Sequence, residues 1–184
     1  MVSLLKYSGL LSLPLFALLA TVLMSHAPGH AVRTHSISKT ILFLHHPTLR
    51  FLFRLNFILK SFVDFIFLWY IAKFFQLSWE SPIIWCLGVA CVLFASLAYF
   101  IEGKHAFWHV LLVYGVGVLW AITEVLLAYH IGVQWFIQYT WVSAIIPTVI
   151  AFWYLYVKKV TVVVQVVCII MIYSWLVVFV TNFL

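Results

Sequence analysis

Long apolar runs separated by short polar connections make up most of the chain. A helix that crosses a bilayer needs about 20 mostly apolar residues. Six runs approach or reach that length, at residues 8–25, 50–73, 82–101, 106–128, 132–157 and 160–183. The one sizeable polar segment is 26–48, and no polar linker divides the chain. The pattern predicts an all-α fold, a polytopic transmembrane helical bundle of about six spans in a single domain over 1–184.

Prolines mark several of these boundaries. Pro82 follows Ser81, an arrangement typical of a helix start, and Pro47 opens the second run in the same way. Pro147 lies inside the fifth run and is expected to kink it. The first run, with "SHAPGHA" after it, is similar to a secretory signal. We expect a retained helix because Pro28 disfavours cleavage before it, although cleavage after Ala31 stays open.

Composition supports membrane insertion. Hydrophobic residues make up 67% of the chain and charged residues 8%, with a mean hydropathy of +1.20. A soluble domain has roughly 45–50% apolar and about 25% charged residues. The sequence therefore predicts an integral membrane protein whose first partner is the lipid bilayer. The net charge of +6 indicates no nucleic-acid partner, since its few basic residues lie mostly beside apolar runs.

The basic residues also predict an orientation. Seven basic residues lie in the first, third and fifth connections or directly after them: Arg33, Lys39, Arg50, Arg54, Lys104, Lys158 and Lys159. The other side has only Lys6 and Lys73. Lys and Arg favour the cytoplasmic side, so loops 1, 3 and 5 are expected in the cytoplasm and both termini outside. Aromatic residues near the opposite ends form the expected belt: Trp69, Tyr70, Trp79, Tyr129, Trp135 and Tyr139.

Polar residues inside the second run share one helix face. Asn56, Lys60 and Asp64 follow one another at a spacing of four, so they stack along a helix and the last two can pair. Ionisable residues at membrane depth usually face the bundle interior. Two interpretations stay open: a self-neutralised seam that guides packing, or the lining of a polar cavity.

A second polar stripe lies in the fourth run. At 100° per residue, its members fall within a sector of about 100°: His105, His109, Trp120, Thr123 and Glu124. We expect this stripe to face other helices, and Gly115 and Gly117 to permit close helix approach. Together the two runs predict an intramembrane polar seam of Asn56, Lys60, Asp64, Thr123 and Glu124.

Histidines suggest a metal site. His105 and His109 lie one turn apart, the spacing of helical zinc sites. Further ligands on the same side are His45 and His46, while Glu102 or Asp64 would orient a water molecule or act as base. Zinc is the cofactor this pattern favours, and haem is weaker because its axial ligands need two helices. Interfacial histidines that only bond headgroups or loops are the alternative.

"HAFWHVLLVYGVGV" resembles the last-helix motif of the CREST superfamily, which contains alkaline ceramidases, progestin-and-adipoQ receptors and hemolysin III proteins. The resemblance implies that His105 and His109 bind zinc in a lipid amide or ester hydrolase. The chain departs from that family because two predicted helices follow the motif and no serine is followed by histidine four positions later. The layout, with "SISK…P…LRFLF", also resembles small six-helix prokaryotic membrane families of unknown function.

Three function classes follow from these residues. The first is a non-catalytic role, as an accessory subunit for other membrane proteins or as a binder of an apolar or lipid ligand. The second is a membrane-embedded zinc-dependent hydrolase of a lipid amide or ester, which requires bound zinc. The third is a small proton-linked transporter using Lys60, Asp64 and Glu124, which ranks last because no inverted repeat is present.

Overall fold

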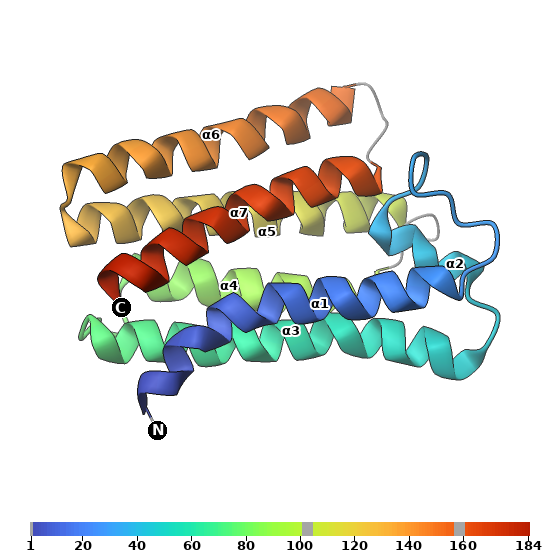
Figure 1. Ribbon diagram of the computed structural model, residues 1–184, viewed down its shortest axis with the longest axis horizontal. Helices are drawn as coiled ribbons and strands as arrows, with labels where there is room; N and C mark the ends of the chain where they lie inside the picture. Colours follow the sequence, from blue (N-terminus) through green and yellow to red (C-terminus); the bar gives the residue numbers. More distant parts are fainter. Residues whose placement is uncertain (1, 101–104, 157–160) are drawn as a thin grey trace.

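The computed structural model describes residues 2–100, 105–156 and 161–184, and these residues are mostly helical with no strand among them. The long helices are α1 (Ser8–Ser25), α3 (Pro47–Phe74), α4 (Pro82–Ser96), α5 (Ala106–Ile131), α6 (Gln134–Tyr156) and α7 (Val162–Phe183). A 3₁₀ helix, Val2–Tyr7, precedes α1. The first connection contains a 3₁₀ turn, Ile37–Lys39, and the short α2, Thr40–Phe43. Helices thus occupy all six predicted runs (Figure 1).

The length and composition of the helices are those of a membrane protein, but they support fewer than the six predicted spans. Among the described residues, three helices are long and apolar enough to span: Leu5–Ser25, Ala106–Ile131 and Val162–Phe183. Helix α4 is apolar but shorter, with 15 residues. Helix α3 has ample length but carries several charged side chains. A helical protein with membrane-span-like helices is therefore established, and six spans remain a prediction.

Helix α4 ends earlier than its hydrophobic run. The run continues to residue 101, but the helix stops at Ser96. The amide N–H groups of Leu97, Ala98 and Tyr99 each bond to a carbonyl three residues earlier, a tight-turn pattern that ends an α-helix. At the other end Pro82 occupies the first turn as predicted, but the side chain of Ser81 makes no capping hydrogen bond. Hydrophobicity alone could not locate the end of this helix.

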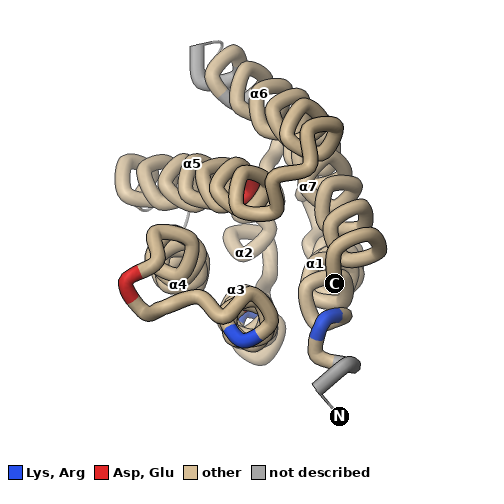
Figure 2. Tube along the Cα trace, turned by 90° about the vertical axis from the view of Figure 1, so that its left-hand side faces the viewer, with Lys and Arg blue, Asp and Glu red and all other residues tan. Residues whose placement is uncertain are grey.

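The six long helices form a ring. Helix α3 packs against α1 and α4, α5 packs against α4 and α6, and α7 contacts α6 and returns to α1. Figure 2 shows this arrangement from one end of the bundle. Consecutive helices run in alternating directions, so both termini lie at the end with the α3–α4 and α5–α6 connections (Figure 1). The starts of α5 and α7 lie at the opposite end, near α2.

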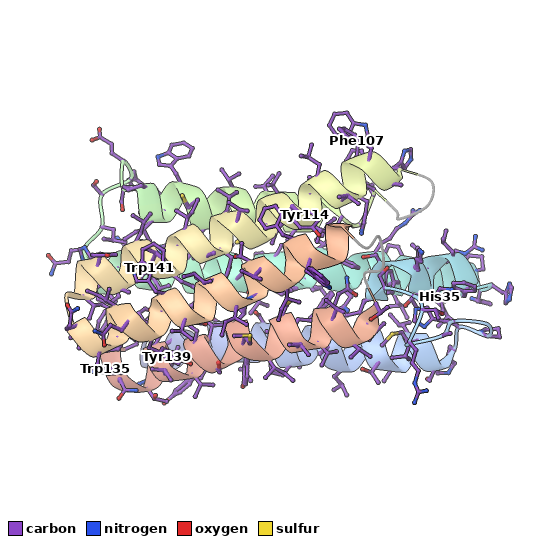
Figure 3. The ribbon with its side chains drawn as sticks, turned by 90° about the horizontal axis from the view of Figure 1, so that it is seen from above. His35, Phe107, Tyr114, Trp135, Tyr139 and Trp141 are labelled. Carbon is purple, nitrogen blue, oxygen red and sulfur yellow. The ribbon has the colours of Figure 1, made fainter. Side chains whose placement is uncertain are left out.

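Two hydrophobic clusters hold the ring together. The cluster nearer the termini contains Phe136, Trp175 and Phe179, whose rings stack at centroid distances between 5.0 and 6.3 Å. The cluster nearer the first connection includes Phe16 and Phe57, which meet edge to face at 5.1 Å. Trp135 and Tyr139, two residues of the predicted aromatic belt, lie with Trp141 at the end opposite His35 (Figure 3).

Candidate functional site

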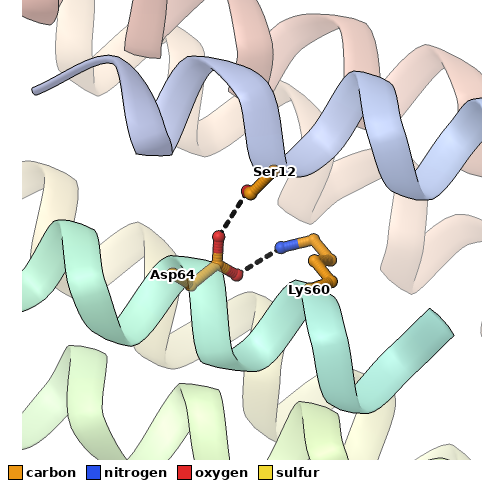
Figure 4. A network of polar contacts seen from close by, with 3 residues as sticks. All are labelled: Ser12, Lys60 and Asp64. Atoms are coloured by element: carbon orange, nitrogen blue, oxygen red, sulfur yellow. Dashed lines mark hydrogen bonds and ion pairs between the residues drawn. The ribbon is translucent and has the colours of Figure 1, made fainter. Parts of the chain in front are cut away.

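A compact polar network joins α1 to α3. The Asp64 carboxylate accepts hydrogen bonds from the Ser12 hydroxyl of α1 and the Lys60 ammonium group one turn earlier in α3 (Figure 4). The Lys60 nitrogen also lies 4.7 Å from the centroid of the Phe94 ring and 5.9 Å from that of Trp120. Each carboxylate oxygen and the ammonium group therefore have a partner, although Asp64 is only 4% exposed.

Asn56 extends this network toward the first connection. Its side-chain amide donates to the Phe16 carbonyl at 3.0 Å, and the residue is buried. Asn56 and Asp64 of the predicted seam thus find hydrogen-bond partners in α1, while Lys60 pairs with Asp64 within α3. This arrangement supports the interpretation of a self-neutralised packing seam for α3.

The α5 members of the seam are buried too, but they are less well satisfied. The Thr123 hydroxyl bonds back to the Leu119 carbonyl at 2.8 Å within its own helix. Glu124 is 2% exposed, and its Oε1 atom has no hydrogen-bond partner among the described residues. A buried carboxyl oxygen without a partner costs free energy, so it calls for a functional or packing explanation.

A cavity of about 310 Å³ lies inside the ring. All six long helices and residues 36–38 of the first connection contribute to its lining. Helix α5 provides the longest wall, from His109 to Glu124, and α6 provides a second wall from Ser143 to Phe152. Most lining side chains are apolar. The volume lies at the lower end of the range of small-molecule pockets, about 300–1,000 Å³.

Unsatisfied polar atoms gather at one end of this cavity. The Glu124 Oε1 atom, the Trp120 indole nitrogen and the Ser143 hydroxyl all line it, and within the described parts of the chain none makes a hydrogen bond. Trp120 is close enough to interact with the Glu124 carboxyl, but the pair does not reach hydrogen-bond geometry. Ser143, from α6, is 5% exposed.

The opposite end of the cavity is closed by the first connection. The Ile37 amide donates to the Gln165 side-chain oxygen of α7 at 2.7 Å, and the Val162 amide donates to the His35 carbonyl at 2.8 Å. His109 is buried here, with its Nδ1 atom 2.7 Å from the Phe100 carbonyl oxygen. The two hydrogen bonds to Gln165 and Val162 fix the connection against the start of α7 and over the cavity.

The histidines predicted to bind metal differ in their exposure and do not gather at one place among the described residues. His109 is buried, whereas His105, His45 and His46 are exposed. His46 accepts a hydrogen bond from the Thr48 amide at 3.3 Å and so caps α3. Glu102 lies outside the described residues. Within residues 2–100, 105–156 and 161–184, no three His, Cys, Asp or Glu side chains come together as a metal site. Zinc binding stays a prediction from sequence.

Several site residues were not identified from sequence. Ser12 and Ser143 each lie alone in an apolar run, where serine carries no pattern of its own. Gly117 was expected to permit close approach of another helix, yet it lines the cavity, and a Cβ atom added there would meet nothing within 4 Å. The cavity depends on how the helices close into a ring, which hydrophobic periodicity does not specify.

Comparison of the chain with family models, curated proteins and solved structures finds no match.

Proposed function

We propose that the protein is a membrane-embedded binder of a long-chain apolar ligand, held in the cavity inside the helix ring. The supporting observation is the cavity itself: a space of about 310 Å³ with a mostly apolar lining, inside a protein whose outer surface is also apolar. A chain molecule from the surrounding lipid matches such a lining, because apolar surface is stabilised by contact with apolar groups.

The shape of the cavity supports a chain-like ligand. The α5 wall runs from His109 to Glu124, which corresponds to roughly 22 Å at 1.5 Å per residue. One leaflet of a bilayer with a hydrocarbon core of about 30 Å is about 15 Å thick. The wall is therefore longer than one leaflet is thick, which supports a chain-like ligand lying along α5.

The membrane arrangement belongs to the same proposal. Helices α1, α3, α4, α5, α6 and α7 would cross the bilayer, with both termini outside and the first connection in the cytoplasm. The alternating helix directions and the basic residues of the first connection support it. Labelling of single cysteines introduced at Thr34 and Trp79 in intact cells tests it. Labelling by an impermeant reagent at residue 34 but not at residue 79 would reverse the orientation.

Filling the cavity tests the ligand proposal. Gly117→Phe places a ring in open space against the cavity, because an added Cβ meets no atom there. We expect the variant to fold normally and to bind a radiolabelled long-chain fatty alcohol at least about tenfold more weakly than the parent protein, a loss of about 1.4 kcal/mol. Measurements in phosphatidylcholine nanodiscs avoid competition from detergent.

Ile122→Phe is the matched control. Ile122 is also on α5 but is exposed and does not line the cavity, so its enlargement leaves binding unchanged. Equal affinities for the parent protein and Gly117→Phe would refute the cavity as the binding site. Mass spectrometry of lipids that copurify with each variant gives an independent measure, because the cavity-filled variant should retain less ligand.

A further inference from the structure

We infer that the ligand carries an uncharged headgroup with both a hydrogen-bond donor and an acceptor, such as a hydroxyl group, and that this headgroup lies at Glu124, Trp120 and Ser143. The inference rests on the proposed function and specifies its ligand. It follows from three buried polar atoms without a hydrogen-bond partner among the described residues, which line one end of a mostly apolar cavity.

The three side chains line the cavity at similar depths in the bundle. Glu124 lies about 10 Å along the helix axis from the end of α5 at Ile131. Ser143 lies about 14 Å from the start of α6 at Gln134, and these two helix ends are adjacent. Trp120 is one turn from Glu124. A headgroup of a few atoms can therefore reach all three groups from the same position.

The chemistry of these groups selects the headgroup. The Glu124 oxygen accepts a hydrogen bond, the indole N–H of Trp120 donates one, and the Ser143 hydroxyl does either. A hydroxyl on the ligand donates to Glu124 and accepts from Trp120. An ammonium group offers donors only, so the Trp120 N–H would stay unsatisfied. A carboxylate offers acceptors only and would place a second acidic group beside Glu124.

The same groups explain why a purely apolar ligand fits less well. An alkane of equal length fills the apolar wall from His109 onward but leaves the three polar groups without partners. Leaving such groups unpaired discriminates strongly against a ligand that lacks the matching group. A primary amide headgroup also offers both a donor and an acceptor and belongs to the same class.

The test compares headgroups on one chain length. Binding of a long-chain alcohol, primary amide, amine, carboxylate and alkane is measured to the parent protein in phosphatidylcholine nanodiscs, whose lipid headgroup has no hydrogen-bond donor. We expect the alcohol and the amide to bind at least about tenfold more tightly than the alkane, and also more tightly than the amine and the carboxylate.

Variants then locate the headgroup. In Glu124→Leu the alcohol and the alkane should bind alike, while alkane binding is kept. In Ser143→Ala the preference for the alcohol should fall about threefold. Thr123→Val is the control, because Thr123 is a buried neighbour whose hydroxyl bonds to Leu119 and does not line the cavity. Its preference for the alcohol should be unchanged.

The outcomes separate the two proposals. Equal binding of alcohol and alkane to the parent protein overturns the headgroup inference but leaves chain binding intact. Tightest binding of the amine or the carboxylate also overturns it. An alcohol preference that survives both Glu124→Leu and Ser143→Ala places the headgroup elsewhere and refutes the assignment. If no chain binds to the parent protein at all, the proposed function fails together with the inference.

Discussion

The α1–α3 contact and the α5–α6 wall both bury acidic side chains, but they treat them differently. In the first, Asp64 has a partner for each oxygen, Ser12 and Lys60. In the second, Glu124 is buried to a similar degree, yet its Oε1 atom has none among the described residues. The first carboxylate is therefore explained by helix packing within the chain. The burial of Glu124 has no such explanation within the described residues, and a ligand bound in the cavity would supply one.

The largest expected effect comes from breaking the satisfied network. Asp64→Leu leaves Lys60 and Ser12 without their common partner, and an unpaired, mostly buried charge is strongly destabilising. We expect the free energy of unfolding to fall by about 3–5 kcal/mol. Thermal unfolding in a mild detergent, followed by tryptophan fluorescence, measures the loss.

The double variant Lys60→Met with Asp64→Leu is the control for that measurement. It removes both charges together, and apolar groups often replace a buried pair without loss of stability. Its stability should return close to that of the parent protein. A double variant as unstable as Asp64→Leu alone would show that the network contributes more than mutual neutralisation.

On the α5 wall, removing the acidic side chain is expected to raise the free energy of unfolding instead of lowering it. Glu124→Leu removes an unpaired buried oxygen, so the ligand-free protein should become more stable by about 1–3 kcal/mol. Glu124→Gln keeps the shape and a polar group, and its stability should change much less. Destabilisation by Glu124→Leu, measured in the same unfolding assay after delipidation, would contradict the contrast between the two carboxylates.

Thr140→Val tests whether the location of a buried polar group or its hydrogen bonding decides if its removal stabilises the fold. Thr140 of α6 and Trp175 of α7 are both buried, and the Trp175 indole donates to the Thr140 hydroxyl at 2.8 Å. Thr140→Val keeps the shape but removes this acceptor, so we expect a loss of about 1 kcal/mol. Stabilisation here would mean that polar groups in this half are generally unfavourable, whether or not they are paired.

The smallest expected effect concerns metal. Because the proposed ligand site uses Glu124 and Ser143, treatment with a chelator should leave binding of the long-chain alcohol unchanged. Elemental analysis of the purified protein and of His109→Ala accompanies this measurement. One zinc ion per chain that is lost in His109→Ala, together with chelator-sensitive binding, would favour the hydrolase hypothesis.

The sequence predicted the helices better than it predicted the site. Helices α1 and α5 begin as expected because apolar runs in a membrane protein favour helices, whose backbone groups are satisfied internally. Burial of Asp64 and Glu124 also follows the expectation that ionisable residues turn inward. The Ser12 partner of Asp64 lies 52 residues away, and no local pattern contains such a contact.

The histidines of the zinc hypothesis show what spacing along a helix cannot predict. A spacing of four placed His105 and His109 on one stripe of α5, but spacing alone does not fix exposure at a helix end. His105 is exposed at the N-cap position, and His109 faces the carbonyl of Phe100. A third ligand would have to come from another segment, and helical periodicity cannot say which segment approaches.

The attachment of the first connection to α7 has a consequence for biosynthesis. Ile37 and Gln165 are joined across 128 positions of the chain. Translation proceeds at about 5–20 residues per second, so residues 35–38 wait on the order of ten seconds for the ribosome to complete their anchor. The first connection can therefore be fixed over the cavity only after α7 has been made.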